Sequence, residues 1–167
     1  MADIKKPHAM RLSANPLFLT DPELRKAIEL LFFAYRNFIQ EPDQMLAELG
    51  LGRAHHRVLY FVGRYPDMPV ANLLEILAIT KQSLSRVLGD LVDAGYVMQQ
   101  QGQRDKRQRL LRLTEKGEIL ESQLSAMQRK RIAAAYKDAG GQAVDGFKKV
   151  MLALLDDPQD RARFNED

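Results

Sequence analysis

The residues of this chain best suited to chemistry are amide, hydroxyl and cationic side chains in two neighbouring segments. The first reads TKQSLSR (80–86) and places Gln82 four residues before Arg86. Glutamine can pair bidentately with adenine, and arginine with guanine, in the major groove of DNA. The second reads QQQGQRDKRQRLLR (99–112) and holds five basic residues against one acid, a net charge of +4. Because the whole chain carries only +3, these charges indicate a polyanion contacted at one place.

Hydrophobic spacing places the first segment on a helix expected from about Lys81 to Ala94. At about 100° per residue, an apolar stripe about 140° wide backs this helix. The stripe comprises Leu84, Val87, Leu88, Leu91 and Val92. Gln82 and Arg86 lie almost opposite, beside Gly89, which suggests a close approach. A merely solvated polar face is the alternative. The candidate base-reading residues are Thr80, Lys81, Gln82, Ser83, Ser85 and Arg86.

A short β-hairpin is expected to carry the second segment. Tyr96-Val97-Met98 is strand-prone, Gly102 lies at the tip, and Arg109–Leu113 is the returning strand. A charged loop that only protects an edge strand from aggregation is the alternative, but five cations exceed that need. We therefore expect a wing along the phosphate backbone, with one arginine in the minor groove. The candidate wing residues are Arg104, Asp105, Lys106, Arg107, Arg109 and Arg112.

The remaining apolar spacing predicts helices on both sides of these segments. Before them we expect a helix from Thr20 to about Ile39, which Pro42 ends or kinks, and a short piece up to Leu49. Two further helices are expected at Arg53–Tyr65 and Val70–Leu77, with a turn at 65–69 between them. After them we expect a helix capped by Thr114 to about Asp138 and a last helix over 144–155, separated by Gly140-Gly141. A helix, a tight connection, a second helix and a basic hairpin form a winged helix-turn-helix, so the fold class is mainly α with a small β-hairpin wing.

At this point a family resemblance becomes specific. The stretch DKRQRLLRLT (105–114), followed by Gly117, resembles the D-x-R-x-x-x-L-x-L-T-x-x-G wing signature of the MarR family of transcriptional regulators. The stretch ITKQSLSRVLGDLVDAGYV (79–97) is similar to that family's recognition helix and following strand, and the element order matches from about 22 to 155. The resemblance implies that Arg107 reaches the minor groove and that Asp105 orients it.

The resemblance further implies a homodimeric repressor. Two recognition helices would enter successive major grooves of a pseudo-palindromic double-stranded operator, about 34–36 Å apart. The implied organisation is a flexible arm (1–19), a single domain (20–158) and a frayed tail (159–167). Within the domain, 53–113 form the DNA-binding lobe, and 20–49 and 114–158 supply N- and C-terminal dimerisation helices, which suits the wide apolar face of 24–39. Many members respond to small aromatic or phenolic effectors bound between the dimer helices and the lobe.

Two adjacent histidines, His55 and His56, allow two interpretations. In the first, one is packed or capping and the other is exposed. In the second, His56 lines an effector pocket together with Tyr35, Phe38 and Tyr60. Neighbouring helical residues point about 100° apart and do not form a natural chelating pair, so we expect no metal site.

Several absences narrow the function. The chain has no cysteine, which excludes disulfides, thiolate zinc sites and a thiol redox signal. It shows neither a signal peptide nor an apolar run of the ~18 residues that a membrane helix needs, so we expect a cytoplasmic protein without membrane contact. No catalytic or cofactor motif is present, so we expect neither an enzyme nor a cofactor. A non-specific DNA-binding architectural or adaptor protein is the rival function.

Overall fold

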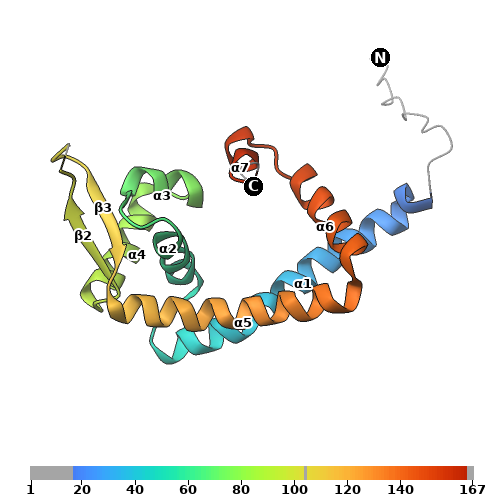
Figure 1. The fold of residues 1–167 in the computed structure, drawn as a ribbon, viewed down its shortest axis with the longest axis horizontal. Helices are drawn as coiled ribbons and strands as arrows, with labels where there is room; N and C mark the ends of the chain where they lie inside the picture. The colour runs from blue at the N-terminus through green and yellow to red at the C-terminus, as the bar shows by residue number, and fades with distance from the viewer. Residues whose placement is uncertain (1–16, 104, 165–167) are drawn as a thin grey trace, which may run out of the picture. The chain divides into compact units, whose positions relative to one another are not determined.

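The computed structural model describes residues 17–103 and 105–164; residues 1–16, Arg104 and 165–167 lie outside the described part. Its contacts divide the chain into two compact units, residues 1–38 and 39–167. The helices are η1 (Leu17–Leu19), α1 (Asp21–Glu48), α2 (Arg53–Arg64), α3 (Val70–Leu77), α4 (Lys81–Asp93), α5 (Glu115–Ala139), α6 (Gly141–Ala153) and α7 (Pro158–Ala162). The strands are β1 (Met68–Pro69), β2 (Val97–Gln101) and β3 (Arg109–Leu113) (Figure 1).

The first unit holds η1 and the N-terminal part of α1, with large apolar side chains left uncovered. Leu17–Leu19, at the end of the expected arm, form a turn of 3₁₀ helix, and the flexibility of the arm stays a prediction. Ion pairs one turn apart support the start of α1, Arg25 with Asp21 at 2.8 Å and Lys26 with Glu23 at 2.6 Å. The exposed apolar side chains include Leu24, Ile28, Leu30, Leu31, Phe32 and Phe33.

Helix α1 runs through Pro42, so of the two expected effects of this residue, an end or a kink, the end is wrong. Proline lacks the amide hydrogen that a helix interior uses and normally breaks the helix. Here Ile39, Pro42 and Leu46 recur at helical spacing and are the buried residues of α1. Their burial favours continuation of the helix despite the missing hydrogen bond. The expected separate piece up to Leu49 is therefore part of the same helix.

A three-stranded antiparallel sheet and helices α2 to α5 enclose the core of the second unit. The strand order is β1-β3-β2, with Met68 opposite Leu111 and Val97 opposite Leu113. The expected turn over 65–69 therefore ends in a strand, and the sheet has three strands rather than two. The fully buried core side chains include Leu46, Leu59, Leu73, Leu84, Leu91, Leu111 and Leu124.

The C-terminal helices follow the expected breaks, with one addition. Gly140 has a φ of +81° and ends α5, after which α6 begins at once. The rings of Tyr136 and Phe147 meet edge to face at 6.1 Å and pack α6 against α5. The tail was expected to be frayed, but Pro158–Ala162 form α7. Asp157 caps this helix by accepting a hydrogen bond from the Gln159 amide at 2.8 Å.

The first turn of α5 packs directly against Gly95 and Tyr96, which connect α4 to β2. Thr114 caps α5 by accepting the Gly117 amide hydrogen at 3.1 Å, and its own hydroxyl donates to the Gly95 carbonyl at 2.6 Å. A Cβ on Gly117 would lie 2.0 Å from the Tyr96 carbonyl oxygen. Only glycine therefore allows this contact between α5 and the backbone that leads from α4 into β2.

Gly117→Ala should destabilise the fold, because its methyl group meets backbone that cannot rotate away. We expect a loss of about 1–3 kcal/mol or more in the free energy of unfolding, measured by urea denaturation at fixed protein concentration.

Gly89→Ala is the matched control, since it is the same change inside a helix. A Cβ at Gly89 meets nothing within 4 Å. Alanine there should stabilise α4 by up to about 1 kcal/mol. Equal effects of the two substitutions would contradict the packing argument.

Candidate DNA-binding surface

Helix α4 presents a polar face that its own apolar stripe positions. Thr80 caps the helix by accepting the Ser83 amide hydrogen at 3.2 Å, as expected. Leu84, Leu88 and Leu91 are buried, and Val87 packs partly against the same core. Val92 is the exception in the expected stripe, because it is exposed at the edge of the helix. The side chains of Thr80, Lys81, Gln82, Ser83, Ser85 and Arg86 are all exposed.

The loop between β2 and β3 is held by its own hydrogen bonds. Gly102 donates to the Gln108 carbonyl at 2.9 Å, and Gln101 donates through Nε2 to the Lys106 carbonyl at 2.7 Å. The Asp105 carboxylate accepts the backbone N–H of Arg107 at 2.9 Å. The contact between Asp105 and Arg107 that the structure shows is therefore through the main chain. Lys106 and Arg107 are exposed at the tip, and Arg104 lies outside the described residues.

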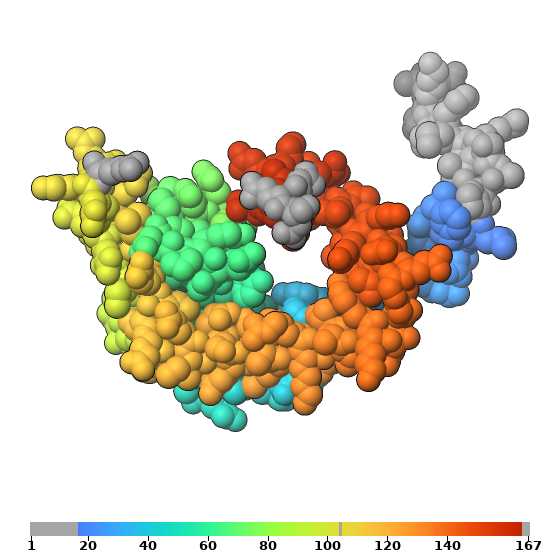
Figure 2. All heavy atoms as spheres, viewed as in Figure 1, coloured from blue at the N-terminus to red at the C-terminus, as the bar shows by residue number. Residues whose placement is uncertain are grey.

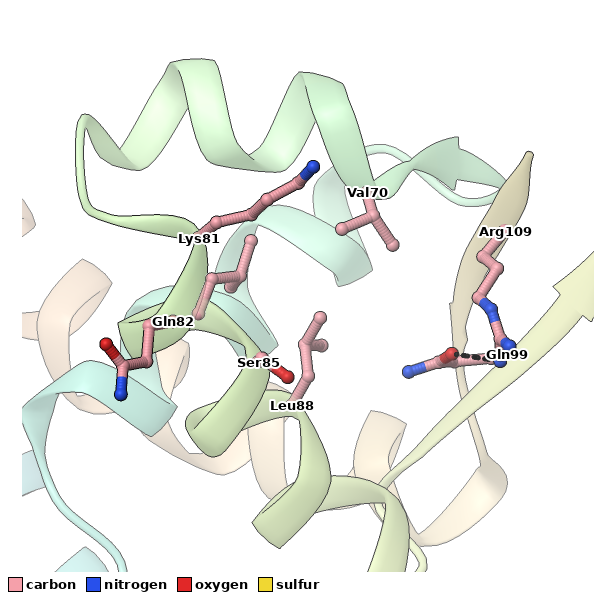
Figure 3. A pocket seen from close by; sticks show the side chains of 8 residues that line it. Val70, Lys81, Gln82, Ser85, Leu88, Gln99 and Arg109 are labelled. Atoms are coloured by element: carbon pink, nitrogen blue, oxygen red, sulfur yellow. Dashed lines mark hydrogen bonds between the residues drawn. The ribbon is translucent and has the colours of Figure 1, made fainter. Parts of the chain in front are cut away.

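The sheet register sends the other two wing arginines to opposite faces. Side chains alternate along a strand, so Arg109 shares a face with the buried Leu111 and Leu113, whereas Arg112 points the other way. Arg109 donates to Gln99 Oε1 at 3.3 Å on the face that looks toward α4 (Figure 3). Figure 2 shows the wing (yellow) extending beyond the helices beside it.

Arg112, one of the expected phosphate contacts, is held in a two-pronged ion pair. Its Nε donates to Asp67 Oδ1 at 2.9 Å, and its Nη2 donates to Asp67 Oδ2. This hydrogen bond from Arg112 holds the pKa of the Asp67 carboxyl below its ordinary value of 3.8. A lowered folded-state pKa means that the pair stabilises the fold above pH 3.8 and loses this effect as pH falls through the folded value. In the structure, Arg112 therefore ties the wing to the turn before β1.

A pocket of about 530 Å³ lies between α4 and the wing. Figure 3 shows Gln99 and Arg109 on the strands facing Ser85 and Leu88 on the helix. The pocket is lined by Val70, Lys81, Gln82, Leu84, Ser85, Leu88, Gln99 and Arg109. Its lining combines an apolar floor with two cations and no acid, so it suits a ligand that carries both carbon surface and negative charge.

Comparison with known proteins shows which family the chain belongs to. It is 51% identical over 156 residues to the HTH-type transcriptional regulator PetP of Rhodobacter capsulatus, an alignment that covers 93% of this chain and 92% of that protein. The chain belongs to the MarR family. The model described as MarR family matches residues 49–108, from the end of α1 through the wing loop. As a MarR-family member, the protein is a DNA-binding transcriptional regulator.

Solved MarR-family structures share the fold at low sequence identity. A MarR-family transcription regulator matches with a TM-score of 0.69 and 20% identity, over 80% of this chain and 88% of that one. Streptococcus pneumoniae FabT in complex with DNA matches with a TM-score of 0.71 and 16% identity, over 78% and 94%. The expected winged-helix fold of the MarR family is confirmed.

The two histidines of this MarR-family chain have different environments, and neither is exposed. His55 Nδ1 accepts the Gly52 amide hydrogen at 3.0 Å, which leaves Nε2 to donate to Asp90 on α4 at 3.1 Å. His56 is buried, and burial lowers its pKa against the opposing charges of Asp43 and Glu121. The expectation of one packed or capping histidine holds, but that of an exposed partner is wrong.

The expected effector-pocket residues are divided between the two units. Tyr35, which is half exposed, and Phe38 belong to the first unit, whereas His56 and the partly exposed Tyr60 belong to the second. Their grouping therefore stays a prediction. Across residues 17–103 and 105–164, no group of three His, Cys, Asp or Glu side chains is arranged to hold a metal ion. In the same residues, no helix has the length and apolar character needed to cross a membrane.

Sequence reasoning missed the residues that fix the wing. Asp67 pairs with Arg112 across 45 positions, and nothing local to Asp67 signals this contact. Gln99 was counted only as part of a polar run, although its hydrogen bond to Arg109 follows from strand alternation once the register is known. The link from His55 to Asp90 spans 35 positions and likewise depends on tertiary packing.

Proposed function

We propose that the protein is a dimeric, sequence-specific repressor that reads a pseudo-palindromic operator with α4 and the wing. The observation that carries this proposal is the exposed polar face of α4 beside a cationic wing, both fixed to one core. The helix face supplies Gln82 and Arg86 for base edges, and the tip supplies Lys106 and Arg107 for the backbone and minor groove. The structural match to FabT, whose structure contains DNA, supports this arrangement.

The dimer is proposed from apolar surface that residues 17–103 and 105–164 leave exposed. Ile28 is 70% exposed and Phe32 61%, and on α6 Val150 is 61% exposed and Leu154 59%. On each helix the two exposed residues lie one turn apart, and apolar surface of this kind marks an interaction site in soluble proteins. A second copy of the chain is the occupant, because a two-fold operator needs two reading heads at fixed spacing.

Release from DNA is proposed to follow binding of a small aromatic or phenolic effector near His56. Its Nε2 atom is buried and has no hydrogen-bond partner within the described residues. A buried ring nitrogen without a partner is a costly group that a polar ligand atom can satisfy. Tyr60, one turn further along α2, is the proposed aromatic neighbour within the same unit. A shift in the spacing of the two heads would then weaken both sets of DNA contacts together.

Selection from random DNA tests sequence reading. We expect the protein to enrich an inverted repeat with half-sites about one helical turn apart. Gln82→Ala and Arg86→Ala should each cost about 1–3 kcal/mol and relax preference at particular positions of the enriched motif.

Arg107→Ala is the contrasting variant in this experiment. It should lower the salt dependence by about one unit of slope while the major-groove positions of the motif stay unchanged. A wild-type protein that enriches no motif would favour the architectural function, and unchanged motifs for the α4 variants would remove their base-reading role.

Ile28→Glu tests the dimer. The wild-type protein should sediment at twice the chain mass of 19.0 kDa, and the variant at the chain mass, because a carboxylate in an apolar interface has no partner. Glu29→Gln is the control on the next residue and should leave the mass unchanged. A monomeric wild-type protein would refute the dimer.

His56→Phe tests the effector proposal, since phenylalanine keeps an aromatic ring but removes the buried nitrogen. Benzoate or phenol should release wild-type protein from its selected duplex in a fluorescence-anisotropy titration, and the variant should need at least about tenfold more, the equivalent of one lost hydrogen bond. Equal sensitivity of the two proteins would remove His56 from the site.

A further inference from the structure

The pocket between α4 and the wing contains Arg109, to which the proposed function above assigns no specific contact. Arg109 is the first residue of β3 and pairs with Gln101, the last residue of β2, where the two strands meet the loop. Three apolar residues, Val70, Leu84 and Leu88, form the floor of the pocket, and Lys81 stands with Ser85 on the helix side. Figure 3 shows the Ser85 hydroxyl and the Arg109–Gln99 pair on opposite sides of this space.

The sheet fixes which way Arg109 points. Residues 97, 99, 101, 109, 111 and 113 share one face because cross-strand partners lie on the same side. Val97, Leu111 and Leu113 use that face to cover the core. Gln99 and Arg109 continue it past the edge of the core, where the sheet overhangs α4. The arginine is thus directed toward the helix by the same alternation that buries its neighbours.

Gln99 restricts the guanidinium further. Its Oε1 accepts from Arg109 Nη1 at 3.3 Å. A guanidinium carries five N–H donors, so this bond uses one and leaves the group able to bind an anion. The eight residues that line the pocket include Lys81 and Arg109 but no acid. The pocket is therefore an anion site with an orienting side chain and with carbon surface beneath it.

We propose that this pocket seats one deoxyribose-phosphate unit of the DNA strand that separates the major groove from the minor groove. The inference rests on the proposed function: if α4 occupies the major groove and the wing tip the adjacent minor groove, the strand between the two grooves passes between helix and wing. Arg109 and Ser85 bind the phosphate oxygens, and the sugar carbons pack over Val70 and Leu88. Gln99 is a positioning residue that acts through Arg109.

The test measures binding to a random-sequence duplex and to the duplex that the wild-type protein enriches, by fluorescence anisotropy over a range of salt concentrations. Arg109→Gln should weaken both complexes about tenfold, as loss of a charge-assisted hydrogen bond implies. It should also lower the slope of log K against log salt by about 0.9, the value for one phosphate. An unchanged slope would overturn the proposal.

A double-mutant cycle separates phosphate binding by Arg109 from the orientation of Arg109 by Gln99. Gln99→Ala should weaken binding about threefold at an unchanged salt slope, because the cation is still present but less oriented. In the Arg109→Gln background the same change should have no further effect. Gln100→Ala is the control on the opposite face of β2, where its Nε2 contacts Met98 Sδ at 3.4 Å, and it should bind like the wild type. An additive loss in the double variant would refute positioning by Gln99.

Neutral methylphosphonate groups, placed singly along the enriched duplex, locate the phosphate that the pocket binds. The wild-type protein should lose affinity at a position between the major-groove and minor-groove contacts in each half-site, and Arg109→Gln should not. Losses of affinity that are the same for both proteins at every position would contradict phosphate binding in this pocket. If the wild type binds all duplexes equally, the sequence-specific function fails, whereas the salt slope on random DNA still decides whether Arg109 binds phosphate.

Discussion

The close approach of α5 to the carbonyl of Tyr96 is the constraint on which the rest of the DNA-binding unit depends. The carbonyl lies where a Cβ on Gly117 would stand, and it also accepts the Thr114 amide hydrogen at 3.0 Å. Lys116 donates to the Ala94 carbonyl at 2.7 Å, at the C-terminal end of α4, and its ammonium lies 4.2 Å from the ring centre of Tyr96. These contacts join the end of α4 and the start of β2 to the first turn of α5. A movement of α5 therefore moves α4 and β2 with it.

This junction explains why one long helix can serve two purposes. The N-terminal half of α5 buries Gly117, Leu120 and Leu124 against the DNA-binding core, whereas Ile132, further along, is 37% exposed. Beyond it, Tyr136 carries α6 and its uncovered Val150 and Leu154. Helix α5 thus connects the packed core to an apolar surface that stays exposed in the part of the chain that the structure describes. Because α5 is attached rigidly at Tyr96, a shift at that surface would also shift α4.

Local patterns predicted most of the elements, and failures occurred where distant contacts decide. The bounds of α3 and β3 and the caps Thr80 and Thr114 follow from spacing and capping rules, because each depends on residues within a few positions. Pro42 does not end α1, because burial of Ile39, Pro42 and Leu46 outweighs the missing hydrogen bond. Strand β1 has only two residues. It forms because Met68 pairs with Leu111 on β3, a partner that no local pattern indicates. The candidate site behaved in the same way: the exposed face of α4 was predictable from the helix alone, but the separate environments of Arg109 and Arg112 were not.

The wing shows why a net charge is a poor guide to the number of phosphates that a protein can bind. Its five basic residues form one patch in the sequence, yet the register and the Asp67 pair give the four described ones different surroundings. Arg112 faces away from α4 and already has a carboxylate partner that would have to be displaced before a phosphate could bind. Lys106 and Arg107 lie at a tip whose backbone is fixed by Asp105 and Gln101. Arg109 alone among the described wing cations lines the pocket against α4. In the proposed function, fewer cations are therefore available to DNA than the total suggests, and the strand alternation of β3 determines which way each of its arginines points.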